Sequence, residues 1–346
     1  MRFNHIFASM LVISSGFFLS ACQTQPLTVS EVNTQDVSHL ALASLDSGRM
    51  MQHLNALENI AKANAGNRAV ATSGGQASAQ YIVAQAKQAG LQAQQVPFEN
   101  RNKKVGQNII VEIKGQSKDT AVIVGAHYDS VAMGPGINDN GSGVALLLEL
   151  MHHYAQQKTA PKHTLYLAFW DSEEEGIGGS SAFVKSLNAE QLKGIQAYVN
   201  VDMVGTKNPT VQIADGDQSS IADLEKILKE RGMAEAEYKP ITDSLRTIPH
   251  HAGDLALEQQ LKTFFKTKGV TIKEDVSTLT ASDTAPFLGK VPVASLILFN
   301  EQMKGDVLEF APCYHQTCDT IEQVDPQSLT LAADAVMYLL DYLNNK

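Results

Sequence analysis

The chain has 346 residues, of which 44% are hydrophobic and 18% are charged, so a packed core of one large or two small domains is expected. The formal net charge is -10, and Lys and Arg do not form long runs. This balance argues against nucleic-acid binding, because phosphate recognition needs clustered cations.

Residues 1–21 have the pattern of a bacterial lipoprotein signal peptide. An apolar stretch over residues 6–19 follows a basic residue and leads into the letters LSAC, which end at Cys22. This pattern predicts cleavage before Cys22 and lipidation of that cysteine, which would anchor the protein to a membrane of the cell envelope. The alternative is an ordinary cleaved signal with a chance cysteine. Residues 22–45 are polar and read as a tether, and Gln23 is no inner-membrane retention signal, so we expect the outer membrane, facing the periplasm.

Helix-like and strand-like patterns alternate along residues 46–346, which we interpret as one folded domain. We predict helices over residues 49–65, 78–89, 142–157, 180–187, 219–231, 254–268 and 326–344. We predict strands over residues 91–98, 108–115, 121–129, 163–170, 197–205, 211–215 and 291–299. Many strands are near-continuous apolar runs, as is typical of strands covered on both faces. We therefore predict a single α/β domain with a mixed, mostly parallel central sheet and helices on both faces, and residues 205–280 are a candidate cap.

Imidazole and carboxylate side chains follow the apolar runs at five places. They are His127, Asp139, Glu174, Asp202 and His315. Ligand sites in parallel α/β sheets lie at the carboxyl ends of the strands, where these residues are expected. Two imidazoles and three carboxylates can hold two divalent ions, with one carboxylate bridging. Such a site makes a hydroxide at neutral pH and holds a carbonyl oxygen, which points to amide hydrolysis.

The motifs around these five residues resemble, in order and spacing, the co-catalytic zinc aminopeptidase family of the secreted bacterial leucine aminopeptidases and aminopeptidase Y. The matching motifs are GAHYDS, NDNGSG, FWDSEEEG, NVDMVG and CYHQTCD. The resemblance implies that His127 and Asp202 hold one zinc ion. It also implies that Glu174 and His315 hold a second zinc ion and that Asp139 bridges both.

The resemblance further implies a general base and a residue that orients a ligand. Glu173 would be the base, and Asp129 would orient His127, which agrees with the way a carboxylate fixes the tautomer of a zinc-bound imidazole. The run of three glutamates leaves the register open. The family pattern places two glutamates before one variable residue and a glycine, so Gly176 assigns the base to Glu173 and the ligand to Glu174.

The motif CYHQTCD holds two cysteines and a tyrosine close to a predicted ligand. Two neighbouring cysteines in an exported protein suggest a disulfide, with two free thiols as the alternative. The resemblance implies a Cys313–Cys318 disulfide and a Tyr314 hydroxyl that hydrogen-bonds the scissile carbonyl oxygen, with a packed tyrosine as the alternative. We interpret Asp283, in another recurrent segment of the family, as a loop-shaping or pocket-lining residue.

These interpretations predict a metallo-aminopeptidase with two zinc ions per chain. Its substrates would be peptides with a free N-terminus, and we expect a monomer. The same donors also accept cobalt or manganese. The alternatives are a carboxypeptidase of the same fold, for which Arg246 could bind the terminal carboxylate, a glutaminyl cyclase, which uses one metal, and a non-catalytic binding module.

Overall fold

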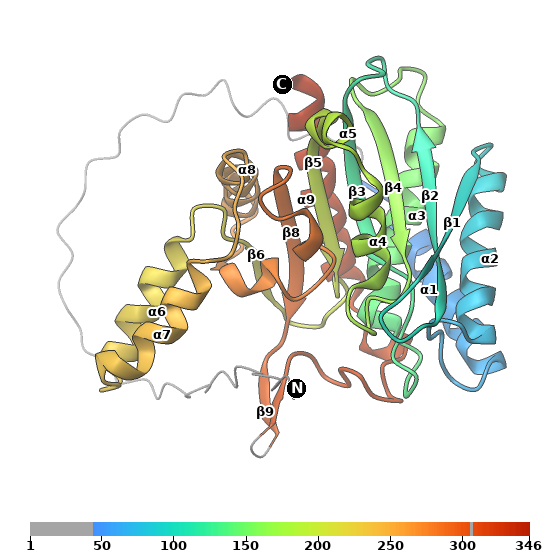
Figure 1. Cartoon of the computed structure of the whole chain (residues 1–346). Coiled ribbons are helices and arrows are strands. Elements are labelled where there is room, and N and C mark those ends of the chain that lie inside the picture. The colour runs from blue at the N-terminus through green and yellow to red at the C-terminus, as the bar shows by residue number, and fades with distance from the viewer. Residues whose placement is uncertain (1–43, 305–306) are drawn as a thin grey trace.

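The computed structural model describes residues 44–304 and 307–346 (Figure 1). The predicted signal peptide, Cys22 and the tether up to residue 43 lie outside the described residues. None of the helices in the two described ranges combines the length and the hydropathy that a bilayer crossing requires.

A mixed sheet of eight strands forms the centre of the described part of the chain. The strands are β1 (Ala93–Glu99), β2 (Val105–Ile113), β3 (Ala121–His127), β4 (Thr164–Trp170), β5 (Ile195–Asp202), β6 (Thr210–Ala214), β7 (Ile272–Asp275) and β8 (Val293–Phe299). Their order in the sheet is β1-β2-β4-β3-β5-β8-β6-β7. The four central strands β4, β3, β5 and β8 are parallel, whereas β1, β2 and β6 join the sheet by antiparallel pairs. A separate hairpin is formed by β9 (Gln302–Lys304) and β10 (Val307–Glu309).

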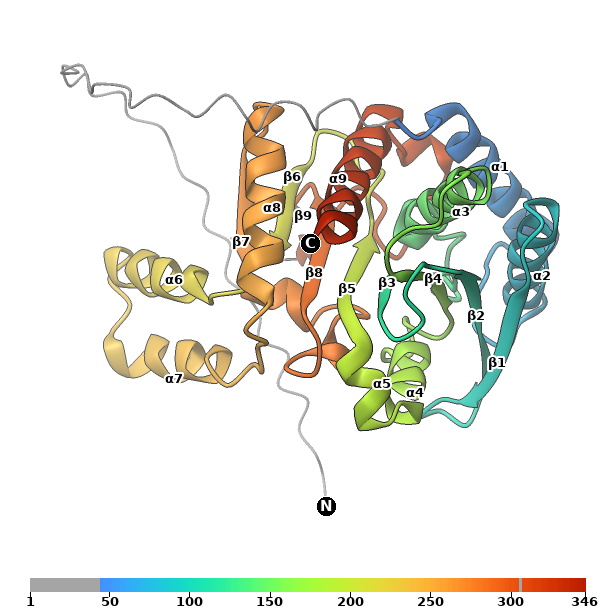
Figure 2. The same ribbon diagram turned by 90° about the horizontal axis from the view of Figure 1, so that it is seen from above.

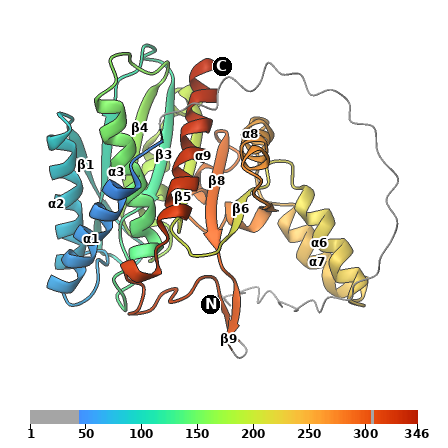
Figure 3. The same cartoon turned by 180° about the vertical axis from the view of Figure 1, so that it is seen from behind.

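Helices cover both faces of this sheet (Figures 1 and 2). The helices of the described residues, of which α6 and α7 project from the body, are α1 (Ser47–Ala63), α2 (Ser73–Gln88), α3 (Ser142–Ala155), α4 (Gly178–Ser186), α5 (Ala189–Gly194), α6 (Ser219–Glu230), α7 (Glu235–Leu245), α8 (Asp254–Thr267) and α9 (Pro326–Asn345). One face carries α1, α2, α3, α8 and α9, which share a hydrophobic core (Figure 3). The other face packs against α4 and neighbouring segments in a second core. This arrangement confirms the predicted α/β domain with a mixed sheet.

The two cores explain why the central strands read as continuous apolar runs. Successive side chains of a strand point to opposite faces of the sheet. In β3, Val122 and Val124 therefore join the core under α3, while Ile123 joins the core on the other face. Both sets are buried, so the run shows no polar alternation.

The predicted elements recur with shifted ends, but some short elements are not predicted. The patterns miss α5, α7, β7 and the β9–β10 hairpin. Helix α7 contains Pro240 and buries Thr242, so it lacks the apolar spacing that marks a helix. Within residues 205–280, β6 and β7 extend the sheet, α8 joins the main core, and α6 and α7 form a hairpin that projects from the body (Figure 1). A cap over the site stays a prediction.

Candidate metal centre

The five predicted ligands come from the ends of neighbouring strands and from two loops. His127 is the last residue of β3, Asp202 is the last residue of β5, and Glu174 follows β4. Because these strands are parallel neighbours, their carboxyl ends meet at one edge of the sheet. Asp139 lies in the turn that leads into α3, and His315 lies in the loop before α9. The fold thus brings all five residues together.

The ligand atoms form two groups that share Asp139. Nε2 of His127 lies 3.3 Å from Oδ1 of Asp139 and 3.6 Å from Oδ1 of Asp202. Nε2 of His315 lies 3.2 Å from Oδ2 of Asp139 and 3.1 Å from Oε2 of Glu174. Within each group of three, all ligand atoms lie within 4.8 Å of one another. The two oxygens of Asp139 therefore face different imidazoles.

The donors in each group suit a divalent ion. Oε1 of Glu174 and Oδ1 of Asp202 are buried without a hydrogen-bond partner among the described residues. A buried carboxylate oxygen without a partner costs free energy. A cation in each group would satisfy these oxygens, and zinc prefers this combination of imidazole and carboxylate donors. The residues present therefore fit the metal that the motifs suggest.

The charged side chains around His315 shift one another's pKa values. Burial opposes the charge on His315, but hydrogen bonds to Asp139 and Glu174 prevail and raise its pKa to about 10. Burial and the charge of Asp139 raise the pKa of Glu174 to about 7, although His315 acts in the opposite direction. A metal ion that binds here must displace protons, so acid competes with the metal.

Asp129 connects His127 to the segment that follows β4. Its side chain is fully buried, and Oδ1 lies 3.4 Å from Nδ1 of His127. The same carboxylate accepts hydrogen bonds from the backbone amides of Glu173 at 3.0 Å and Glu174 at 3.3 Å. Asp129 thus lies beside the far nitrogen of the imidazole with its carboxylate and also with its backbone carbonyl oxygen, which is 3.2 Å from Nδ1.

The three consecutive glutamates point in different directions. Glu174 belongs to the group around His315, whereas Glu175 turns away and pairs with Lys104 and with the Asn102 side-chain amide. Glu173 belongs to neither ligand group found in the described residues. Burial raises its pKa well above the usual range of a glutamate, and the charge of His127 opposes this shift. Of the three glutamates, only Glu174 thus lies in a ligand group of the described residues, and the assignment of the base to Glu173 stays a prediction.

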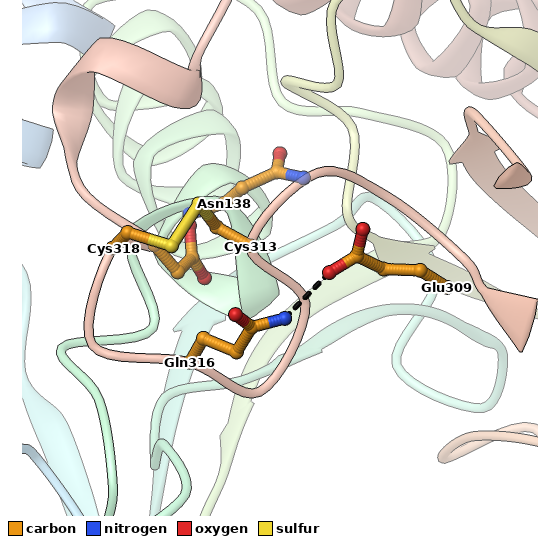
Figure 4. The surroundings of a disulfide bond; sticks show 6 residues. Asn138, Glu309, Cys313, Gln316 and Cys318 are labelled. Carbon is orange, nitrogen blue, oxygen red and sulfur yellow. Dashed lines mark hydrogen bonds between the residues drawn. A yellow bond between two sulfur atoms is a disulfide. The ribbon is translucent and has the colours of Figure 1, made fainter. Parts of the chain in front are cut away.

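A disulfide closes the loop that carries His315. The structure contains a bond between Cys313 and Cys318, whose Cα atoms are 5.3 Å apart (Figure 4). The ring of Tyr314 stacks on the His315 imidazole, with 3.8 Å between the ring centroids. In the same loop, the Gln316 side-chain amide donates a hydrogen bond to Glu309 (Figure 4). The loop is therefore held from two sides next to the second ligand group.

The profile described as Peptidase family M28 matches residues 108–340, which include all five candidate ligands. The chain belongs to peptidase family M28. This membership confirms the resemblance that the sequence motifs carry.

The chain is similar to individual relatives and to solved structures to different degrees. The probable lipoprotein aminopeptidase LpqL of Mycobacterium tuberculosis is 35% identical over 244 residues, which cover 67% of this chain and 44% of LpqL. The structure of BSAP, a zinc aminopeptidase from Bacillus subtilis, is 25% identical with a TM-score of 0.51, over 70% of this chain and 51% of BSAP. A glutaminyl cyclase from Porphyromonas gingivalis has a TM-score of 0.61 at 18% identity, over 88% and 100% of the chains, and shares the fold. The chain spans about half of the length of the curated relatives that it matches.

Ser282, Arg68 and Asp319, which contact a candidate ligand or the loop between two of them, were not found from the sequence. Ser282 donates a hydrogen bond to Oδ2 of Asp202 at 2.7 Å, and the fully buried Asp283 accepts one from Ser180. Among the described residues Asp283 belongs to neither ligand group, and its role in shaping the loop or lining the pocket stays a prediction. Arg68 and Asp319, which contact the loop between two ligands, gave no signal because their contacts arise only from the tertiary fold.

Proposed function

We propose that this chain is an aminopeptidase that uses two zinc ions to release N-terminal residues from peptides. His127 and Asp202 would hold one ion, Glu174 and His315 the other, and Asp139 both. The observation that carries the proposal is the pair of ligand groups that share Asp139. The names of LpqL, a lipoprotein aminopeptidase, and BSAP, a zinc aminopeptidase, support it.

Bound zinc would polarise the scissile carbonyl group and lower the pKa of a water molecule. Glu173 is the general base of the proposal. It accepts the proton of the attacking water and delivers it to the leaving amine. Burial raises the pKa of Glu173 well above the usual range of a glutamate, which supports this role for a carboxyl group in a site of this kind.

One further side chain would position a ligand and the base, and another would stabilise the negative charge that develops on the substrate. Asp129 holds the imidazole of His127 and the amides of Glu173 and Glu174, so it fixes a ligand and the base relative to each other. Tyr314 would donate a hydrogen bond to the carbonyl oxygen of the substrate, where negative charge develops. Its stacking on His315 supports a place beside the second ion.

The proposal includes the cell envelope as the place of action. Lipidation of Cys22 would anchor a monomer to the outer membrane, facing the periplasm, where peptides with a free amino group are the substrates. The name of LpqL as a lipoprotein supports an anchor of this kind.

Two alternatives on the same fold are less well supported. A glutaminyl cyclase uses one metal and would not need both ligand groups. A carboxypeptidase needs a free cation for the terminal carboxylate, but Arg246, directly after α7, is paired with Glu225 at 2.7 Å. Both observations favour the aminopeptidase.

A peptide-library digest tests the proposal directly. We expect the zinc-loaded protein to shorten peptides from the N-terminus, as read by mass spectrometry, and to hydrolyse aminoacyl-anilides. A chelator should abolish this activity and zinc should restore it. Trimming from the C-terminus, or no turnover of any peptide with a free amine, would refute the proposal. A metal content near one ion per chain would instead support the cyclase.

A further inference from the structure

Arg68 is a buried cation beside the loop that joins two candidate ligands. It lies between α1 and α2 and has an exposed fraction of 0%. Its guanidinium donates hydrogen bonds to the backbone carbonyls of Pro135 at 2.9 Å, Gly136 at 2.5 Å and Tyr128. Its backbone amide donates to Oγ of Ser130 at 2.9 Å. One residue thus contacts the loop at four places.

The loop approaches its surroundings closely at Gly136. Gly136 has a φ of +61°, and a Cβ atom there would lie 2.4 Å from the carbonyl oxygen of Asp139 and 3.2 Å from Nη2 of Arg68. A left-handed φ and a close approach of backbone are both positions that favour glycine. The carbonyl groups of this tight turn therefore converge on the guanidinium, whose planar fork can bind several of them at once.

Asp319 holds the same loop from its amide side. Its carboxylate accepts hydrogen bonds from the amides of Asn138 at 2.9 Å and Asp139 at 3.0 Å, and its own carbonyl accepts one from the amide of Ile137 at 3.1 Å. Arg68 therefore binds carbonyls, and Asp319 binds amides, of the segment that runs from His127 to Asp139. Both residues are buried.

Arg68 also faces the carboxylates of the centre. Burial opposes its charge, whereas Asp129, Asp319, Asp139 and Glu174 all favour it. An arginine stays protonated in proteins, so this cation is permanent. It offsets part of the repulsion among carboxylates that a metal-free centre must hold close together.

We propose that Arg68 is a positioning residue that fixes the loop between His127 and Asp139, and so holds the shared carboxylate in place for metal binding. Asp319 holds the same loop from its amide side, and we refer to Arg68 and Asp319 together as the clamp. The inference rests on the metal centre of the proposed function, but it concerns how the centre is built rather than what it hydrolyses.

Zinc affinity is the readout that tests this inference, measured by competition with a chromophoric chelator. We expect Arg68→Met, which removes the charge and all side-chain hydrogen bonds, to weaken zinc binding by about tenfold or more, as loss of an outer-shell partner does in metal sites. Arg68→Lys keeps the charge but not the fork, so its affinity should lie between those of Arg68→Met and the natural protein.

Arg49→Met is the matched control, because Arg49 pairs with the buried Glu149 at the α1–α3 contact rather than with the loop. It should lower the melting temperature and leave zinc affinity unchanged. Natural zinc affinity in Arg68→Met, or an equal loss in Arg49→Met, would overturn the inference. If Arg68→Met does not fold, Arg68→Lys decides by the same affinity measurement.

The outcomes separate this inference from the proposed function. A protein that binds two zinc ions but cleaves no peptide would refute the aminopeptidase, while the affinity of the Arg68 variants would still report on the clamp. A natural protein that binds no zinc would overturn both. If the natural protein is active and Arg68→Met binds zinc with the same affinity, only the role of the clamp is overturned.

Discussion

The carboxylate of Asp129 accepts a hydrogen bond from the backbone amide of Glu173 at 3.0 Å while its Oδ1 lies 3.4 Å from Nδ1 of His127. One buried residue therefore contacts both a candidate ligand and the candidate base, since its backbone carbonyl oxygen also lies 3.2 Å from Nδ1 of His127. A movement of its carboxylate would change the distance between His127 and Glu173.

Asp129→Asn tests this connection with almost no change in volume. The amide loses one acceptor oxygen, so it cannot serve His127 and both backbone amides as the carboxylate does. We expect kcat/KM to fall by roughly 10- to 100-fold, because outer-shell partners of metal ligands have effects of this size. Steady-state kinetics with an aminoacyl-anilide would measure it, and unchanged kinetics would show that Asp129 has no orienting role.

Glu173→Gln should separate proton transfer from metal binding. Because Glu173 belongs to neither ligand group, zinc content should stay the same while kcat falls by roughly 10²- to 10⁴-fold. Glu175→Gln is the control from the same run of glutamates, since Glu175 is engaged by Lys104 and should matter little. Similar activities of the two variants would speak against Glu173 as the base.

His315→Ala should weaken metal binding in one ligand group and leave the other group intact. It removes one ligand of the group with Glu174 but leaves His127, Asp139 and Asp202 in place. We expect about one zinc ion per chain, since three protein ligands are enough for a zinc site. Asp139→Ala should lose more metal, because it belongs to both groups. Elemental analysis after dialysis would measure this, and equal losses in the two variants would contradict a shared carboxylate.

His53 gives an acid-sensitive contact between helices α1 and α3. It is buried, its Nδ1 lies 2.7 Å from the Tyr81 hydroxyl, and it stacks on His152. Burial, then the charge of His152, lowers the pKa of His53 from 6.5 to about 4, while Glu149 acts in the opposite direction. Between pH 6.5 and pH 4 the imidazole is protonated in the unfolded state but not in the folded state. The free energy of unfolding therefore has its full value above pH 6.5 and decreases by roughly 3 kcal/mol as the pH falls to 4.

The His53→Gln variant provides the comparison for this pH effect. Glutamine carries no titratable group, so the variant should lack this part of the pH dependence. Urea unfolding at several pH values would measure the free energy of unfolding of both proteins. If the two curves run parallel between pH 6.5 and pH 4, protonation of His53 does not contribute.

The sequence contained most of the fold and the ligands because both follow from short-range patterns. Strand β3 is a run of apolar residues that ends at His127, and this alone puts an imidazole at the edge of a parallel sheet. The assignment of Glu173 and Glu174 rests on the family resemblance, in which the position of Gly176 sets the register, and it stays a prediction. Arg68 could not be found in this way, because a buried arginine that binds carbonyls of a distant loop has no local signature. Helix α7 was missed for a different reason, since its hairpin buries few side chains.

The bond between Cys313 and Cys318 connects the chemistry of this protein to its compartment. Disulfides persist in oxidising surroundings and are rare where thiols are kept reduced. His315 lies between the two bonded cysteines. In a reducing cytoplasm the bond would be absent, so the loop that carries His315 would lack this restraint. If the export that residues 1–22 predict takes place, this bond would form only after the chain has left the reducing cytoplasm.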